Sequence, residues 1–377
     1  MKTLRYLLPL TILTSILSCN KSTLEIPIIV SPSIDSNKMV LIGNNAGKFY
    51  AINANTGQQI WEANTGGQIY GSATGNSNTV FVGSFDRKLY AFDLATGATK
   101  WTYTTEGAIY GSPVYFRNQI FVASAAPTRK FYCIDAATGL KKWEYVPLNA
   151  NAGGAQSPAI DSINNTVYFD GGDDFSIYAI DLVTGLKKWE YATASWIGGV
   201  AQTNNTVFIC STDGYVYAIN ALSGILKWRS VNLGVNFGDP SISGNKLVAG
   251  SITSGQYSLD INTGAVIWKN SSNGDSSPFI VDSIVYYGSG TTVTAVTLNA
   301  GIEKWKVTTG GSNISSPVVN NGILYIGNQD NKLYAIDAIT GVMKWSFLTN
   351  APITQPSAII LTQSGKCIHS SLSGVVN

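Results

Sequence analysis

Histidine and charged residues are scarce in this sequence. His369 is the only histidine, and 12 % of the 377 residues are charged. A metal site made of three histidines is therefore excluded, and one histidine near the C-terminus is a weak basis for general acid–base catalysis. Lys and Arg total 24, two of them within the first 18 residues, and the others are balanced by 22 Asp and Glu. Without a basic excess to displace counterions from phosphates, a nucleic-acid partner is not expected.

The sequence begins with a charged and then apolar segment. Lys2 and Arg5 precede an apolar run from Leu7 to Leu17, and Ser18 ends it. This run is too short for a transmembrane helix, which needs about 20 apolar residues. Its three regions predict a secretory signal over residues 1–18.

The end of this segment, Ile16-Leu17-Ser18-Cys19, resembles a bacterial lipobox. The resemblance implies that Cys19 is lipidated, with residues 19–25 as a tether and residues 26–377 as one folded domain. Secretion without a lipid is the alternative. No dense acidic run follows Cys19. We therefore expect a chain anchored in the bacterial cell envelope, in the outer membrane and facing the periplasm.

A glycine followed four residues later by a tryptophan recurs eight times, at steps of 37 to 46 residues. Such self-similarity is typical of a propeller or a solenoid. The repeated tryptophans are Trp61, Trp101, Trp143, Trp189, Trp228, Trp268, Trp305 and Trp345. Because a propeller blade cannot cover its own faces, we expect these rings to be buried at blade junctions.

Each repeat contains four short runs rich in β-branched and aromatic residues. In residues 112–145 these runs are 112–115, 119–123, 130–135 and 141–145. Gly, Asn, Asp, Ser or Pro residues bound them, as is typical of strands. The sequence therefore predicts an all-β, eight-bladed propeller of four-stranded antiparallel blades.

A turn of the form Asp-x-x-Thr-Gly joins the third and fourth strands, as in Asp93 to Gly97. The carboxylate and the hydroxyl can accept bonds from the turn's own amides, and glycine supplies a positive φ. The seventh turn begins with Thr297 and has no carboxylate. We expect it to be the least well fixed.

Three cysteines follow Cys19, and an odd number cannot form a closed disulfide framework. Cys133 and Cys210 stand where other repeats have alanine or glycine within strands. We expect both to pack in the core as small residues. Cys367, in the last segment, has no such assignment.

The combined pattern, found for example from Tyr334 to Trp345, resembles the pyrroloquinoline-quinone-like (PQQ-like) repeat over about residues 30–348. The resemblance implies that the tryptophans staple neighbouring blades. That family holds quinone-dependent dehydrogenases and BamB-like outer-membrane lipoproteins that act as assembly scaffolds. The adjacent cysteine pair and long insertions of the dehydrogenases do not occur here. The resemblance therefore favours the scaffold branch, with no catalytic residues and no cofactor.

A ninth first-strand motif at residues 354–360 and a further strand at 366–370 follow the eighth tryptophan. Residues 354–377 are therefore either a clasp that joins the N-terminal blade or a ninth blade cut short. We favour the clasp, because a closed ring leaves no exposed sheet edge.

The segments that enter each first strand should meet around the central funnel. They carry aromatic and amide side chains that could stack on a sugar or grip a peptide. The candidates are Tyr70, Tyr110, Gln156, Trp196, Phe237 and Asn313, with Asp275 and Gln355 at the equivalent positions. The alternative is that these rings plug the channel and pack against one another.

The adjacent pair Asp173 and Asp174 is the densest oxygen cluster. Calcium needs six to eight oxygens, so we expect hairpin-turn residues there rather than a metal site. The leading hypothesis is accordingly a non-enzymatic, lipid-anchored scaffold that holds protein partners, as in outer-membrane protein assembly. A glycan- or cell-wall-binding module is the alternative, and a quinone-dependent dehydrogenase is the less favoured third.

Overall fold

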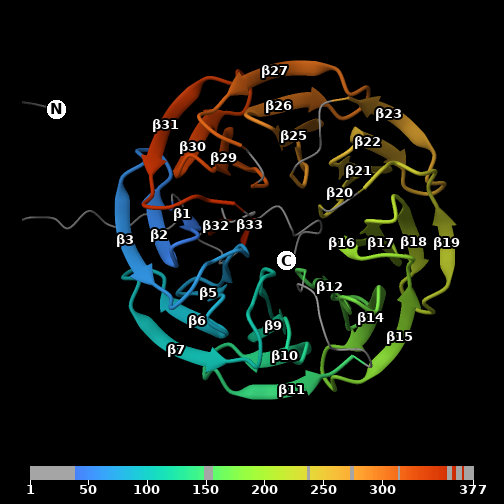
Figure 1. Ribbon diagram of the computed structural model, residues 1–377, viewed down its shortest axis with the longest axis horizontal. Helices are drawn as coiled ribbons and strands as arrows, with labels where there is room; N and C mark the ends of the chain where they lie inside the picture. The colour runs from blue at the N-terminus through green and yellow to red at the C-terminus, as the bar shows by residue number, and fades with distance from the viewer. Residues whose placement is uncertain are drawn as a thin grey trace, which may run out of the picture. The chain divides into compact units, whose positions relative to one another are not determined.

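The structure is a computed structural model that describes residues 39–147, 156–235, 238–271, 276–312 and 315–354, and the backbone of 359–361 and 367–368. These residues belong to a compact unit of residues 35–377. Their regular elements are all strands, which form eight antiparallel sheets arranged in a ring (Figure 1). The predicted eight-bladed β-propeller is confirmed. In this part of the chain, no helix has the length and apolarity to cross a membrane.

The first four blades contain the following strands. Blade 1 has β1 (Met39–Gly43), β2 (Lys48–Asn53), β3 (Gln59–Asn64), β32 (Ile359–Leu361) and β33 (Cys367–Ile368); blade 2 has β4 (Thr74–Gly75), β5 (Thr79–Gly83), β6 (Lys88–Asp93) and β7 (Thr99–Thr104); blade 3 has β8 (Val114–Phe116), β9 (Gln119–Ser124), β10 (Lys130–Asp135) and β11 (Lys141–Tyr145); blade 4 has β12 (Ala159–Asp161), β13 (Thr166–Asp170), β14 (Ser176–Asp181) and β15 (Lys187–Ala192).

The other four blades follow in chain order around the ring. Blade 5 has β16 (Ile197–Thr203), β17 (Thr206–Ser211), β18 (Val216–Asn220) and β19 (Leu226–Arg229); blade 6 has β20 (Ser241–Ser243), β21 (Lys246–Ser251), β22 (Gly255–Asp260) and β23 (Val266–Asn270); blade 7 has β24 (Phe279–Val281), β25 (Ile284–Ser289), β26 (Thr292–Thr297) and β27 (Glu303–Thr308); blade 8 has β28 (Val318–Asn320), β29 (Ile323–Gly327), β30 (Lys332–Asp337) and β31 (Met343–Leu348).

Burial differs between the middle and the outer strands of a blade. All five residues of β5 are buried, whereas exposed and half-buried residues alternate along most of β7. A middle strand lies between two neighbouring blades, so both of its faces need apolar side chains. The outer strand faces solvent on one side and shows the two-residue period of a half-buried strand.

In blade 3 the predicted third and fourth strands match the bounds of β10 and β11, and the second is one residue short. The first was predicted from Ser112, but β8 begins at Val114. Pro113 precedes it and has no N–H to give to a strand ladder.

The C-terminal segment closes the ring. Strand β32 pairs antiparallel with β1, with Val40 opposite Ile360, and so takes the inner position of blade 1. Strand β33 pairs with the other edge of β32 and makes this sheet five-stranded. The C-terminal segment is therefore a clasp. Because β1 already pairs with the outer edge of β32, the second strand of the clasp, β33, pairs with its inner edge, which faces the centre of the ring.

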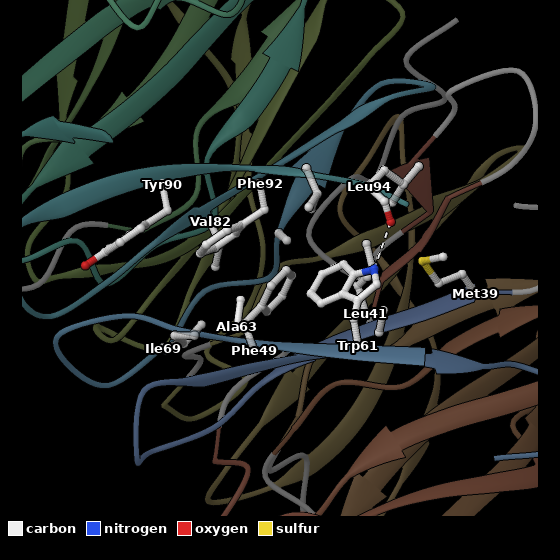
Figure 2. Close-up of a cluster of buried hydrophobic side chains, with 13 residues drawn as sticks. Met39, Leu41, Phe49, Trp61, Ala63, Ile69, Val82, Tyr90, Phe92 and Leu94 are labelled. Atoms are coloured by element: carbon white, nitrogen blue, oxygen red, sulfur yellow. Dashed lines mark hydrogen bonds between the residues drawn. The ribbon is translucent and has the colours of Figure 1, made fainter. Parts of the chain in front are cut away.

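The repeated tryptophans join each blade to the next. Figure 2 shows the first junction, where the Trp61 indole lies among apolar side chains of blades 1 and 2 and donates to the Leu94 carbonyl at 2.9 Å. The seven other indoles donate across their junctions in the same way, at 2.7 to 3.2 Å: Trp101 to Ala136, Trp143 to Leu182, Trp189 to Ala221, Trp228 to Ile261, Trp268 to Leu298, Trp305 to Ala338 and Trp345 to Ala54. The last of these bonds joins blade 8 to blade 1.

The glycine of each third-to-fourth-strand turn receives the indole of the preceding blade. Gly97 has a φ of 74°, and a Cβ atom built on it would lie 2.7 Å from Cε3 of Trp61. The same conflict arises at the equivalent glycine of every other blade. Glycine is therefore needed twice at this position, for the backbone conformation and for room.

The carboxylate at the start of these turns accepts the bonds that the sequence predicted. Asp93 Oδ1 accepts from the N–H groups of Ala95 and Thr96, both at 3.1 Å. In the seventh turn the Thr297 hydroxyl accepts one bond, from the Ile302 N–H at 3.2 Å. That turn has fewer bonds to side chains, as expected.

Both Cys133 and Cys210 are fully buried free thiols. Burial raises the pKa of the Cys133 thiol to about 12 and raises that of Cys210 as well. Both thiols are therefore protonated at neutral pH, and their predicted place in the core is confirmed.

Candidate functional site

The antiparallel order of the strands gives the propeller two different ends. The links between blades and the turns between second and third strands share one end, which we call the link end. The turns between first and second strands and between third and fourth strands share the other, which we call the turn end. The predicted funnel residues that the structure describes, Tyr70, Tyr110, Gln156 and Trp196, belong to blade-to-blade links and so lie at the link end.

Tyr70 and Tyr110 come together at the link end. Their rings stack with centroids 5.9 Å apart, although they lie on successive links. Phe85, from a turn of blade 2, contacts both rings edge-on, at 5.3 Å from Tyr70 and 4.5 Å from Tyr110. Tyr110 remains 37 % exposed. These three rings pack on one another and leave one side of Tyr110 to solvent.

Trp196 lies on the link between β15 and β16, at the same end of the propeller. Its backbone carbonyl accepts from the Thr212 N–H at 2.9 Å, and its residue surface is 50 % exposed. The link is thus fixed by its backbone while the indole is available to solvent. Trp196 is the most exposed aromatic residue among those that the structure describes.

Gln156 contributes its backbone to a buried ion pair. Its N–H donates to Asp170 Oδ2 at 2.8 Å, and the other oxygen of Asp170 pairs with Arg129. Burial lowers the pKa of Arg129 to about 10, while the nearby carboxylates of Asp174 and Asp173 oppose that shift. Arg129 remains charged at neutral pH and ties blade 3 to blade 4. The other predicted funnel residues, Phe237, Asn313, Asp275 and Gln355, lie outside the described residues.

The second-to-third-strand turns use their carboxylates locally. Asp174 Oδ1 accepts from the Ser176 N–H at 2.9 Å, and its Oδ2 accepts from the Tyr178 hydroxyl at 2.6 Å. Asp213 makes the same pair of bonds to Tyr215 and Tyr217. These are hairpin-turn residues, as predicted. Within the described parts of the chain, no group of three or more His, Cys, Asp or Glu side chains could hold a metal ion.

A belt of serines at the start of the first strands joins blades around the channel. The Ser72 N–H donates to Ser112 Oγ at 2.9 Å, and the Ser112 N–H donates to Ser157 Oγ at 3.0 Å. On the far side of the ring, the Ser277 N–H donates to Ser316 Oγ at 3.0 Å. Ser112, Ser157 and Ser316 thus each accept a bond from the preceding blade.

Among the described residues, two interrupt this belt. Gly199 and Asp239 stand at the serine positions of blades 5 and 6, and Asp239 Oδ1 accepts from the Val200 N–H at 3.3 Å. A Cβ atom on Gly199 would lie 2.4 Å from the Asp239 Cα and 2.6 Å from that same oxygen. The glycine therefore provides the room for both the backbone and the carboxylate of Asp239. Burial raises the pKa of Asp239 to about 7.

Sequence reasoning missed Phe85, Arg129 and Asp239. Alignment of the first strands on their serines would have exposed Gly199 and Asp239 as departures from the repeat. Nothing in the sequence indicates that Arg129 finds its partner in the next blade, because the two residues are 41 positions apart.

The repeated tryptophan junctions, the capped turns and the closed ring of eight blades define a PQQ-like β-propeller. The chain matches the family model described as outer membrane protein assembly factor BamB over residues 45–201, 173–301 and 257–374. Those matches include most of the chain, which therefore belongs to the BamB family.

Curated relatives match smaller parts. BamB of Moranella endobia is 25 % identical over 193 residues, which are 44 % of this chain and 49 % of the relative. BamB of Yersinia pestis is 26 % identical over 39 % of this chain and 42 % of the relative. A tetrathionate hydrolase of Acidithiobacillus ferrooxidans is 26 % identical over 39 % of this chain and 28 % of its own length. The chain thus spans about half the length or less of these relatives.

Solved structures agree on the fold. BamB of Moraxella catarrhalis has a TM-score of 0.62 at 18 % identity, over 83 % of this chain and 92 % of that one. Quinohemoprotein alcohol dehydrogenase of Comamonas testosteroni has a TM-score of 0.51 at 17 % identity, over 85 % and 67 %. At these identities the likeness concerns architecture alone, and one architecture carries both scaffolds and enzymes.

Proposed function

We propose that this protein is a non-enzymatic, lipid-anchored scaffold of the bacterial cell envelope that holds a protein partner of the outer-membrane assembly machinery. The observation that carries the proposal is the BamB-family match, which extends from residue 45 to residue 374. The predicted signal at residues 1–18 and the lipobox cysteine, Cys19, support an outer-membrane anchor facing the periplasm. The eight stapling tryptophans serve the ring and are not available to a partner.

Affinity capture of the full chain from solubilised envelope membranes tests this proposal. We expect an outer-membrane assembly component, such as the barrel insertase, to be recovered. The control is the same chain with Trp189→Ala, which removes an indole from the junction of blades 4 and 5 and should weaken the fold and the capture together. Recovery of abundant unrelated proteins only, from a correctly folded chain, would contradict the proposal.

A glycan-binding function is the second candidate, and the exposed Trp196 indole favours it. An aromatic face can stack on a sugar ring. We expect Trp196→Ala to abolish retention on envelope polysaccharide while the thermal unfolding midpoint stays unchanged, because half of this residue contacts solvent. Tyr110→Ala should weaken retention too, with some loss of stability, since Tyr110 packs on Phe85. Retention that survives Trp196→Ala would exclude this function.

Quinone-dependent catalysis is the third reading, and it has its own test. Added quinone and calcium should restore dye reduction if the chain is such an enzyme. We expect no dye reduction at any quinone concentration.

A further inference from the structure

Seven of the eight blade junctions share one apolar arrangement of four side chains. At the first junction, Phe49 and Ala51 of blade 1 pack in one cluster with Val82 and Tyr90 of blade 2, and Figure 2 shows Phe49, Val82 and Tyr90 there. The equivalent four side chains of six further junctions also lie together in single clusters: Leu89, Ala91, Val122 and Tyr132; Phe131, Cys133, Phe169 and Tyr178; Ile177, Ala179, Ile209 and Tyr217; Val216, Ala218, Ala249 and Tyr257; Val293, Ala295, Ile326 and Tyr334; and Leu333, Ala335, Ile42 and Tyr50.

The junction of blades 6 and 7 holds polar residues at the same four places. We call them the polar junction set: Gln256 and Ser258 on β22 of blade 6, and Tyr287 and Thr294 on β25 and β26 of blade 7. The strand pairing defines these places. Ser258 lies opposite the stapling Trp268, where the other junctions have alanine or Cys133, and Thr294 lies opposite Tyr287, where the others have tyrosine.

The polar junction set faces inward from both blades. The Trp268 indole donates to the Leu298 carbonyl of blade 7 at 2.7 Å, so the face of β22 that carries Ser258 is directed at blade 7. Tyr287 packs in one apolar cluster with Trp268, and its strand partner Thr294 shares its face. The side chains of Gln256, Ser258, Tyr287 and Thr294 are all fully buried.

Three members of the set carry polar atoms that the described part of the chain leaves without a hydrogen-bond partner. These atoms are both the oxygen and the nitrogen of the Gln256 amide, Ser258 Oγ and Thr294 Oγ1. Burial of an amide or a hydroxyl without a bond destabilises a fold, and native proteins leave few such groups. Because these atoms belong to facing strands of one junction, we expect a shared partner between them.

The residue sizes provide room for a small partner. In other junctions the tyrosine is long enough for its hydroxyl to accept a bond from the link, as Tyr90 does from the Gly66 N–H at 3.1 Å. Thr294 is shorter by a whole ring, and this difference exceeds the volume of a water molecule. Tyr287, at a place where most junctions have Ile or Val, takes back only a part of that volume.

The chemistry of the set selects the partner. A primary amide offers a donor and an acceptor, and the two hydroxyls can act as either, so the matching molecule must donate and accept as well. The set contains no charged side chain that could neutralise an ion. Full burial of all four residues restricts the partner to a very small molecule. Water meets each of these conditions, and it bridges polar groups that are too far apart to bond directly.

We propose that ordered water binds between blades 6 and 7 and bridges Gln256 and Ser258 on one blade to Thr294 on the other. This junction would then be held by hydration where the other seven are held by apolar contact. The inference goes beyond the proposed scaffold function and does not rest on it.

A crystal structure of the full chain, at a resolution that shows ordered water, is the direct test. We expect an electron-density peak at about 2.7 to 3.2 Å from both the Gln256 amide and Thr294 Oγ1. A Gln256 amide that bonds directly to Ser258 or Thr294, without such a peak, would overturn the proposal. Density for a larger solute in the junction would overturn it too.

A dry variant gives the matched control. Gln256→Val, Ser258→Ala, Tyr287→Ile and Thr294→Tyr copy the four residues with which blades 7 and 8 pack, namely Val293, Ala295, Ile326 and Tyr334. Because the chain already holds this combination at another junction, we expect the variant to fold and the density peak to be absent. A peak that remains in the folded variant would contradict the assignment of water to these side chains.

Single substitutions keep the proposal testable if the dry variant does not fold. Thr294→Val and Gln256→Leu each remove one side of the bridge, and in urea unfolding we expect their combined effect on the midpoint to be smaller than the sum of the two. Thr294→Ser retains the hydroxyl, so Gln256→Leu should shift the midpoint equally in that background and in the wild type. Additive effects of Thr294→Val and Gln256→Leu would overturn the bridge. Neither measurement involves a partner protein, so its outcome is independent of the capture experiment.

Discussion

Asp239 should make the stability of the propeller fall as the pH rises from about 4 to about 7. Its carboxyl group is buried at the start of a first strand, where other blades have serine, and burial raises its pKa from 3.8 to about 7. Between these two values the folded protein holds a proton that the unfolded chain has released. The stabilisation that protonated Asp239 gives the folded state is therefore fully present below about pH 4 and is lost as the pH rises toward 7.

The size of this effect follows from the shift. One pKa unit corresponds to about 1.4 kcal/mol, so a shift of about three units corresponds to about 4 kcal/mol of unfolding free energy. Few groups offset the cost of the charge: the Val200 N–H donates at 3.3 Å, and the nearby Cys210 thiol is itself neutral. Above pH 7 the folded protein is ionised as well, and the loss should level off.

Asp239→Asn removes the titration and keeps the shape of the side chain. We expect the variant to match the wild type near pH 3.5 and to exceed it by a few kcal/mol near pH 7.5. Urea unfolding followed by tryptophan fluorescence at a series of pH values gives the difference. Carboxylates that the substitution does not touch, such as Asp337, whose pKa the Thr340 N–H and the Lys344 ammonium hold at about 2, titrate alike in both proteins and cancel. If the difference between the two proteins is the same at both pH values, the reasoning about Asp239 is refuted.

Three further predictions concern the blade junctions and the core. Gly185→Ala should lower the unfolding free energy by about 2 kcal/mol or more in the same urea assay, because φ is 71° and the new Cβ meets Trp143. Its control is Gly244→Ala, where φ is 58° and the space around the Cβ is open; this variant should lower the unfolding free energy by about 1 kcal/mol. Trp345→Phe should lower the unfolding free energy by at least about 1 kcal/mol, because the indole bond to the Ala54 carbonyl across the closing junction is lost. An unchanged urea midpoint would contradict this prediction. Cys133 and Cys210 should resist iodoacetamide in the folded protein and react in urea, as mass spectrometry would show, and rapid native labelling would contradict their burial.

The repeat made most of the fold predictable from the sequence. A blade is a local unit, and its turns, glycines and tryptophans are written within about 40 residues. That is why the blade number, the bounds of the third and fourth strands of blade 3 and the role of the turn carboxylates followed from spacing and residue type. The structure added the partner of each indole, which is a carbonyl in the next blade.

The candidate site was less predictable because it depends on contacts between links. The sequence placed Tyr70 and Tyr110 at equivalent positions, yet only the ring arrangement stacks their side chains and adds Phe85 edge-on against both. In the same way, whether an aromatic residue of a link is covered or exposed depends on its neighbours in space, and among the described link residues Trp196 is the aromatic that the fold leaves half exposed.

The sequence by itself determined the architecture, the repeat count and the residues that each turn needs, because these rest on interactions within one blade or between identical blade edges. Tertiary structure alone decided that β32 enters blade 1 as a clasp with β33 inside it, that Gly199 makes room for Asp239, and that Arg129 pairs with Asp170. The contacts of β1 with β32, of Gly199 with Asp239 and of Arg129 with Asp170 each join residues about 40 or more positions apart. No local pattern specifies such a pair, since only closure of the ring sets which residues meet.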